Sequence, residues 1–364
     1  MLAQRMNMID SSGIRKVFNL AAKLENPINL SIGQPDFDVS DEVKEAAINA
    51  IRAGVNKYTL TAGMPDFQNQ IMDKLKETRG IDFESVIITS GVSGGILLAF
   101  LALLNPGDEV LVPDPYFVMY KHLANFLGAK PVYIDTYPDF KLREEALEAA
   151  VTPKTKVLLL NSPSNPTGAT YDEESLKMIS NFVKKHNIQL ITDEIYESFC
   201  YDSEYKSILP YCPEALLLSG FSKCAAMTGW RLGYAAGPKH IVDAMTQIQQ
   251  YTFVCAPSMV QEAGKVALMM EMEQQRENYK RKRDLIYNGL KDYYEVEKPG
   301  GAFYIFPKAP NGDGDAFVEE CIKNSLLVVP GSVFSEKKTH FRLSYAATDE
   351  TIERGIEVLQ KLAK

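Results

Sequence analysis

Cysteine and histidine are scarce in this chain. It contains five cysteines and four histidines among 364 residues. The cysteines are scattered and odd in number, and no Cys-x-x-Cys pair or Cys/His spacing typical of a metal ligand set occurs. The sequence therefore predicts neither a disulfide framework nor a zinc site.

The chain also lacks long apolar runs and an excess of positive charge. No apolar run approaches the roughly 20 residues that span a bilayer, and the polar residues 1–10 contain no apolar core of a signal peptide. The net charge is −8, with 39 Lys and Arg against 47 Asp and Glu. This negative charge argues against nucleic acid or an anionic membrane as a partner. We therefore expect a cytoplasmic protein that binds neither.

Apolar runs alternate with helical patterns through the middle of the chain. Hydrophobic residues make up 46% of the sequence, enough for a large core, and the length suits two domains. Short apolar runs separated by helical stretches are typical of a mostly parallel central sheet with helices on both faces. The runs occur at 86–89, 109–112, 131–134, 157–160, 188–191 and 215–218. We therefore expect an α/β fold.

Toward the carboxyl terminus the pattern changes. Long charged helical stretches such as 271–293 are followed by short strand patterns and an amphipathic helix over 349–364. We interpret residues 1–40 as an amino-terminal arm and part of the small domain, residues 41–270 as the large domain, and residues 271–364 as a smaller α+β domain. No glycine/serine linker occurs, so we expect the boundary to lie within one long helix.

Lys223 follows the last apolar run and opens a loop of small residues, Ser222-Lys223-Cys-Ala-Ala-Met-Thr-Gly-Trp-Arg231. A lysine placed in this way can form a Schiff base with an aldehyde, and the planar guanidinium of Arg231 can clamp a phosphate. The stretch closely resembles the lysine signature of the class I/II pyridoxal-phosphate aminotransferases, the family of aspartate and aromatic aminotransferases. The resemblance implies fold type I, the cofactor pyridoxal 5′-phosphate, and Lys223 as the catalytic lysine.

Asp193 ends another predicted strand, at the edge of an open α/β sheet where ligands bind. A carboxylate there can keep the pyridine nitrogen of the cofactor protonated, whereas the alternative is an aspartate that only caps the next helix. The family has an aspartate followed three positions later by a tyrosine, and Asp193 and Tyr196 match that pattern. The match implies that both are catalytic residues that bind the cofactor, with Tyr196 donating to its 3′ oxygen.

The segment Asn161-Ser-Pro-Ser-Asn165-Pro-Thr-Gly168 also follows a predicted strand. By its composition it indicates a turn, but Asn-Pro-Thr-Gly matches a motif of the family. The match implies that Asn165 contacts both the 3′ oxygen of the cofactor and the carboxylate of the substrate. We also expect a cis bond between Asn165 and Pro166.

Gly91, Val92 and Ser93 lie between a predicted strand and an apolar helix. Small residues allow backbone N–H groups to approach an anion at a helix N-terminus, although glycine turns before helices are common. We expect these three residues to bind the cofactor phosphate through the backbone, with Ser222 and Arg231 completing the site.

An aromatic residue stacks on the pyridine ring in the family. In the segment Pro113-Asp-Pro-Tyr116-Phe117-Val-Met-Tyr120, Phe117 aligns best with that position. Tyr116 and Tyr120 are rivals, and all three could equally be core aromatics.

The resemblance also implies a substrate site and a partner subunit. Arg342 matches an arginine in the small domain that pairs with the substrate carboxylate, and such pairs are bidentate and fix orientation. Gly33 resembles a loop residue that offers its backbone to the substrate. Tyr58 matches a tyrosine that reaches the phosphate of the neighbouring subunit, which implies a homodimer with shared active sites.

These residues predict an aminotransferase that moves an amino group between an L-amino acid and a 2-oxo acid such as 2-oxoglutarate. Aspartate, alanine and aromatic amino acids are all plausible donors, because only Arg15, in the amino-terminal arm, is a candidate to bind a distal carboxylate. A β-lyase or other pyridoxal-phosphate chemistry at the same site is an alternative. Two further alternatives are not enzymes: a regulatory domain that binds the cofactor, and a purely structural α/β protein.

Overall fold

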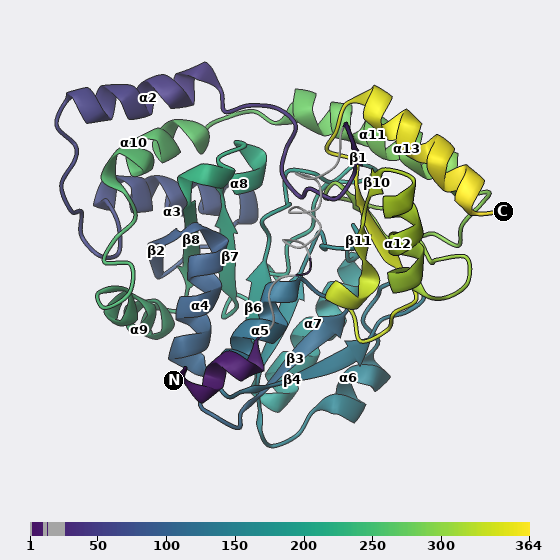
Figure 1. The fold of residues 1–364 in the computed structure, drawn as a ribbon. Coiled ribbons are helices and arrows are strands. Elements are labelled where there is room, and N and C mark those ends of the chain that lie inside the picture. Colours follow the sequence, from purple (N-terminus) through teal and green to yellow (C-terminus); the bar gives the residue numbers. More distant parts are fainter. Residues whose placement is uncertain (1, 10–12, 14–25) are drawn as a thin grey trace.

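A seven-stranded sheet forms the centre of the computed structural model, which describes residues 2–9, 13 and 26–364 (Figure 1). The strand order is β2-β8-β7-β6-β5-β3-β4, and all pairs are parallel except those that β8 makes. The strands are β2 (Ser85–Ser90), β3 (Glu109–Asp114), β4 (Lys130–Asp135), β5 (Thr155–Asn161), β6 (Gln189–Asp193), β7 (Leu216–Gly220) and β8 (Leu232–Gly237). The predicted fold class is confirmed.

Helices cover both faces of this sheet, because alternate strand residues point to opposite sides. Val157 and Leu159 of β5 pack into one core with the helices α4, α5 and α9, whereas Leu158 and Leu160 pack into another with α3, α6, α7 and α10. The helices are α2 (Asp41–Arg52), α3 (Pro65–Arg79), α4 (Gly91–Leu103), α5 (Val118–Phe126), α6 (Glu144–Ala150), α7 (Glu173–His186), α8 (Phe221–Cys224), α9 (Lys239–Gln249) and α10 (Ser258–Ala267). The strand ends that carry the predicted motifs therefore meet at one edge of a covered sheet.

The carboxyl-terminal part has a hydrophobic core of its own, which also takes in Ile28 and Leu30 from near the start of the chain. A short strand, β1 (Ile28–Asn29), pairs in parallel with β10 (Leu326–Leu327), and a small antiparallel sheet has the order β11-β12-β9. The remaining elements are α11 (Glu273–Leu290), α12 (Gly314–Lys323), α13 (Asp349–Leu362), β9 (Tyr304–Ile305), β11 (Val329–Pro330), β12 (Phe341–Ser344), and the 3₁₀ turns η1 (Gln4–Met8), η2 (Thr228–Trp230) and η3 (Gly331–Val333). In Figure 1 this part occupies the upper right.

The expectation of one long helix at the domain boundary is wrong. The chain forms two helices, since α10 ends at Ala267 and α11 begins at Glu273. The reason is packing: α10 lies against α2 and α3, whereas α11 lies against α13, and the chain must turn between these two surfaces. The division of the chain at residue 270 stays a prediction.

Candidate active site

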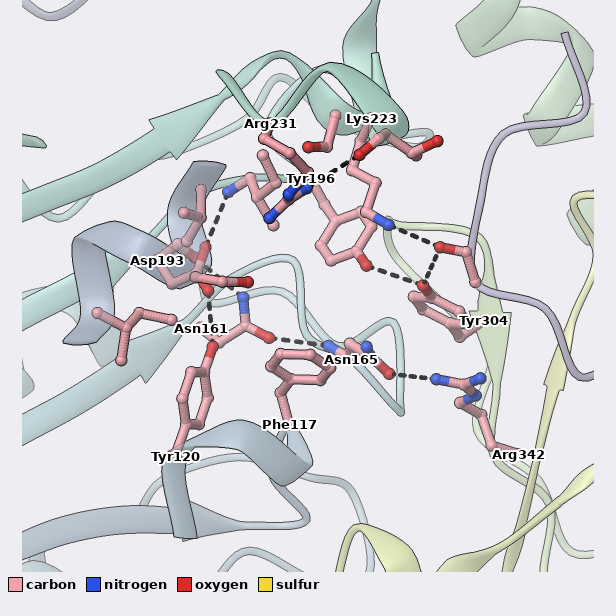
Figure 2. A pocket seen from close by; sticks show the side chains of 17 residues that line it. Phe117, Tyr120, Asn161, Asn165, Asp193, Tyr196, Lys223, Arg231, Tyr304 and Arg342 are labelled. Carbon is pink, nitrogen blue, oxygen red and sulfur yellow. Dashed lines mark hydrogen bonds between the residues drawn. The ribbon is translucent and has the colours of Figure 1, made fainter. Parts of the chain in front are cut away.

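A cavity of about 300 Å³ lies where the carboxyl ends of the parallel strands meet the carboxyl-terminal part (Figure 2). Sequence-predicted residues provide most of its lining. Those that line it are Gly33, Val92, Ser93, Phe117, Asn165, Asp193, Tyr196, Ser222, Lys223, Arg231 and Arg342. The motifs read separately from the sequence are therefore brought together around one cavity.

Lys223 lies in the short helix α8, directly after β7, and its side chain lines the cavity, with the amine directed toward Tyr304 (Figure 2). Its Nζ donates to the carbonyl oxygen of Gly33 at 2.6 Å. Burial lowers the pKa of the Lys223 ammonium to about 8; the charges of Arg342 and Arg231 act in the same direction, and that of Asp193 opposes them. A buried lysine of this kind gives up its proton easily enough to act as a nucleophile and base.

Asp193 is the last residue of β6, and both of its carboxylate oxygens accept hydrogen bonds. Oδ2 accepts from the hydroxyl of Tyr120 at 2.7 Å, and Oδ1 accepts from the backbone N–H of Ile195 at 3.2 Å. Burial raises the pKa of Asp193 to about 6, although these two hydrogen bonds act against the rise. The bond from Ile195 stabilises a turn, and no helix begins there, so the alternative of a helix cap is wrong; the residue presents a carboxylate to the cavity.

Arg231 lies against the N-terminus of α4. A Cβ atom added to Gly91 would come within 2.7 Å of its Nη2, and one added to Gly233 within 2.7 Å of the carbonyl carbon of Gly91. Nη1 of Arg231 donates to the carbonyl of Thr228 at 2.9 Å. Gly91 is not among the residues that line the cavity, but its lack of a side chain leaves room for the Arg231 guanidinium at this end of it. The guanidinium and the helix N-terminus both favour an anion at this end.

The turn after β5 is held by the side chain of Asn161. Its Oδ1 accepts from the backbone N–H of Asn165 at 2.9 Å, and its Nδ2 donates to the carbonyl of Asp193 at 3.0 Å. The predicted cis bond between Asn165 and Pro166 is confirmed. Asn161 thereby fixes two of the predicted functional residues relative to each other, a role that the sequence analysis missed.

The three aromatic candidates separate clearly in the structure. Phe117 and Tyr120 line the cavity, whereas Tyr116 does not. The ring of Tyr116 stacks on Tyr133 with centroids 5.1 Å apart, and its hydroxyl donates to Glu336 at 2.8 Å. Because the hydroxyl of Tyr120 is bonded to a carboxylate, Phe117 stays the predicted stacking residue.

Arg342, in β12, is only 1% exposed. Its Nη1 donates to Oδ1 of Asn165 at 3.0 Å and its Nη2 to the carbonyl of Ser31 at 2.8 Å, but its Nε is buried without a hydrogen-bond partner. The guanidinium carbon lies 4.6 Å from the ring centroids of both Tyr304 and Phe334. A buried cation whose donors are not all used is suited to pairing with an anion that enters the cavity.

One predicted residue of the described part lies away from the cavity. Tyr58 is 84% exposed and is not among the residues that line this cavity. Arg15 lies outside the described residues.

Tyr304 is a further lining residue that the sequence analysis did not identify. It is the first residue of β9, shortly after Gly300 and Gly301, and its ring and hydroxyl both face predicted site residues. The sequence pattern there indicates a turn followed by a strand. Nothing in that local pattern indicated that the Tyr304 side chain faces the cavity.

Within the described ranges, no group of His, Cys, Asp and Glu side chains could hold a metal ion. No helix in the same part of the chain is both long and apolar enough to cross a membrane.

Comparison with known proteins gives the family. A family model described as aminotransferase class I and II matches residues 25–359. The chain belongs to the class I and II aminotransferases. Members of this family with this fold depend on pyridoxal phosphate, so the chain is a pyridoxal-phosphate-dependent enzyme. The two alternatives that are not enzymes, a regulatory domain and a structural protein, are therefore excluded.

Curated relatives of this aminotransferase match along their full length. A probable aspartate aminotransferase of Methanocaldococcus jannaschii is 38% identical, with 100% of both chains covered. Aromatic-amino-acid aminotransferase 2 of Thermococcus litoralis is 36% identical, with 100% of this chain and 98% of the relative covered. The solved structure of the Thermus thermophilus aspartate aminotransferase with maleate is similar with a TM-score of 0.96 at 34% identity, covering 100% of this chain and 99% of that one.

The residues around the cavity fit the cofactor of this family. The α4 N-terminus and Arg231 offer donors for a phosphate at one end, and the carboxylate of Asp193 offers an acceptor for a ring N–H. The amine of Lys223 lines the same cavity. The donors and acceptors present are therefore the ones that pyridoxal phosphate requires.

Proposed function

We propose that this aminotransferase moves an amino group between an L-amino acid and a 2-oxo acid such as 2-oxoglutarate, with Lys223 joined to the cofactor by a Schiff base. When bound, pyridoxal phosphate supplies an aldehyde that condenses with amines and a ring that takes up electrons from a bond to Cα. The observation that carries the proposal is that the amine of Lys223 and the guanidinium of Arg342 line one cavity.

Lys223 moves the proton. When the cofactor and an amino acid are bound, the free amine of Lys223 would take the proton from Cα of the substrate as a general base and return it as a general acid. The lowered pKa, about 8, means that a neutral amine is accessible near physiological pH.

Asp193, Tyr196 and Asn165 hold the ring. The Asp193 carboxylate accepts from the protonated ring nitrogen, and its bond from Tyr120 fixes the carboxylate orientation. Tyr196 and Asn165 donate to the 3′ oxygen, and Phe117 stacks on the ring face. Within one chain the phosphate is bound by Ser222, Arg231 and the backbone of Gly91, Val92 and Ser93.

Arg342 binds the α-carboxylate of every substrate. Its guanidinium is fixed by Asn165, Ser31 and the two flanking rings, so an incoming carboxylate meets a cation that needs little reorganisation. Gly33 offers its backbone beside the same carboxylate. Relatives are named for aspartate and for aromatic amino acids, which supports donors from those two classes, and we keep alanine as a third candidate.

A panel of amino donors tests this proposal. Purified protein is loaded with cofactor and mixed with each L-amino acid, with and without 2-oxoglutarate, while glutamate and the visible spectrum are followed. We expect a yellow protein that forms glutamate from at least one of aspartate, alanine or an aromatic amino acid, and only when the 2-oxo acid is present. Ammonia released without any acceptor would show a lyase instead, and absence of a visible band would contradict the cofactor assignment.

We also propose a homodimer with shared active sites. Tyr58, Leu60 and Tyr251 are 84%, 65% and 85% exposed. The loop that carries Tyr58 lies beside the end of α9 and the start of α10. Gln249 donates to the carbonyl of Thr61 at 2.6 Å, and the hydroxyl of Ser258 donates to the carbonyl of Val55 at 2.8 Å. Large apolar side chains gathered on a surface in this way are typical of a covered interface. In the dimer, Tyr58 reaches the phosphate of the partner subunit.

The cytoplasmic location and the lack of nucleic-acid and membrane partners stay predictions.

A hybrid dimer tests the shared site. Lys223→Ala and Tyr58→Ala chains, carrying different tags, are co-expressed and the mixed dimer is isolated. If each site combines Lys223 of one chain with Tyr58 of the other, the hybrid contains one intact site and one with both changes. We expect it to be more active than either parent variant. Light scattering that shows a monomer, or a hybrid no more active than its parents, would rule out the arrangement.

A further inference from the structure

Tyr304 connects the cofactor side of the cavity to the substrate side (Figure 2). It is 1% exposed, and its hydroxyl lies 2.8 Å from that of Tyr196 and 3.4 Å from the carbonyl oxygen of Gly33. Its ring faces the guanidinium of Arg342. The hydroxyl of Tyr304 therefore contacts Tyr196 and Gly33, whereas its ring contacts Arg342.

A count of protons fixes the direction of the bond between the two tyrosines. Each phenol has one proton to donate. In the proposed function Tyr196 gives its proton to the 3′ oxygen of the cofactor, so toward Tyr304 it can only accept. The competing acceptor, the carbonyl oxygen of Gly33, lies farther from the Tyr304 hydroxyl, at 3.4 Å against 2.8 Å for Tyr196. The proton of Tyr304 therefore goes to Tyr196.

We propose that Tyr304 is a positioning residue that donates to Tyr196 and thereby strengthens the hydrogen bond that Tyr196 gives to the cofactor. The inference rests on the proposed function. A hydroxyl that accepts a hydrogen bond becomes a better donor, because bonds in a chain polarise one another. Stronger donation to the 3′ oxygen withdraws negative charge from it. The nitrogen that joins Lys223 to the cofactor then holds its proton less tightly.

Removing the Tyr304 hydroxyl should thus raise the pH at which that nitrogen loses its proton. The visible absorbance of the bound cofactor reports this midpoint without any turnover. In Tyr196→Phe, which loses the direct bond, we expect the midpoint to rise by roughly half a pH unit or more. Tyr304→Phe should shift it in the same direction by a smaller amount.

The double variant shows whether Tyr304 acts through Tyr196. If it does, adding Tyr304→Phe to Tyr196→Phe changes the midpoint no further, since the intermediary is already gone. The ring over Arg342 is kept in phenylalanine, so KM for the amino acid should stay near that of the wild type while the midpoint moves. A structural defect would instead change both values together.

Tyr294→Phe is the matched control. The hydroxyl of Tyr294 is also buried and donates to the carbonyl of Leu359 at 2.7 Å, but it is not among the residues lining the cavity. It should leave the midpoint unchanged, and thermal melting of the cofactor-free variants checks that all of them fold.

The possible results separate the role of Tyr304 from the proposed function. An unchanged midpoint in Tyr304→Phe, beside a shifted one in Tyr196→Phe, would overturn the role of Tyr304 alone. A further shift in the double variant would show that it does not act through Tyr196. A wild-type protein without a visible band would remove the proposed function and this inference with it.

Discussion

The end of the cavity around Asp193, Lys223 and Arg231 comes from neighbouring strands of one sheet and the turns that follow them. The end around Arg342 is assembled from separate segments: β12, the turn after β5, and the backbone near Ser31. The first end is therefore positioned by a single rigid element. The second depends on how the carboxyl-terminal part and the amino-terminal segment meet the sheet.

The buried charges at the two ends also differ in how fully they are paired. Both oxygens of Asp193 accept hydrogen bonds, whereas Nε of Arg342 is buried without one. A buried donor left unpaired costs free energy, and a carboxylate that enters the cavity can remove that cost. We infer that the Asp193 carboxylate is oriented before any ligand binds, whereas the donors of Arg342 are completed by the ligand.

Lys223→Ala should have the largest effect, because it removes the group that both holds the cofactor and moves the proton. We expect a loss of transamination on the order of several powers of ten, with some cofactor still bound by the phosphate and ring contacts. Single-turnover measurements with loaded protein check this. Near wild-type turnover would show that another base moves the proton.

Asp193→Asn should reduce turnover strongly but by less than the lysine change. An amide keeps the shape yet cannot stabilise a protonated ring nitrogen as a carboxylate does. Asp114→Asn, at a second buried aspartate that is not among the cavity-lining residues, is the matched control for loss of a buried carboxylate. Kinetics unchanged from the wild type would mean that Asp193 is only a turn cap.

Arg342→Lys separates the two ends most directly. Lysine keeps the charge but lacks the planar fork, so affinity for every amino acid and oxo acid should fall by at least about tenfold, while the cofactor spectrum stays the same. Arg283→Lys is the control, because that arginine is also fully buried but pairs with Asp202 outside the cavity. It should lower stability without changing KM. Weaker binding of dicarboxylic substrates alone would assign Arg342 to a distal group.

The pH dependence of cofactor loading should show the smallest effect. The pKa of Lys223 is lowered, and only the neutral amine attacks an aldehyde. The loading rate of cofactor-free protein should rise with pH and level off above about pH 8. With an ordinary lysine, the loading rate would continue to rise up to roughly pH 10.4. Stopped-flow absorbance measures it, and a rate still rising at pH 10 would contradict the burial argument.

The cofactor end could be predicted from the sequence largely because its motifs are local. Each consists of an apolar run and the turn after it, as at Asn165, Asp193 and Lys223, and strand ends of a parallel sheet must meet at one edge. The strands of the sheet could be predicted from apolar runs only in part. Strand β8 was not among the predicted runs, because Gly233, Ala235 and Ala236 give it little apolar character.

Other features depend on tertiary contacts that no local pattern contains. Tyr304 faces the cavity because β9 pairs with β12, which sets the direction of its side chain. The choice among Tyr116, Phe117 and Tyr120 depends on where α5 begins, and sequence patterns locate helix ends only to within a few residues. The turn between α10 and α11 likewise comes from the two surfaces on which those helices pack.

The bond from Arg342 to the carbonyl of Ser31 joins residues 311 positions apart. Strand β1 likewise pairs with β10, which comes about 300 residues later in the chain. A ribosome makes the chain from its amino terminus, and domains generally fold as they emerge. Every strand of the large sheet, from residue 85 to residue 237, is therefore synthesised before β10 and β12, which supply the strand pairing of β1 and the bond to Ser31. Limited proteolysis of nascent chains stalled at increasing lengths would follow this order. We expect residues 26–33 to stay cleavable until after β12 has emerged, so that a newborn chain acquires its cofactor-binding sheet before it can recognise a substrate.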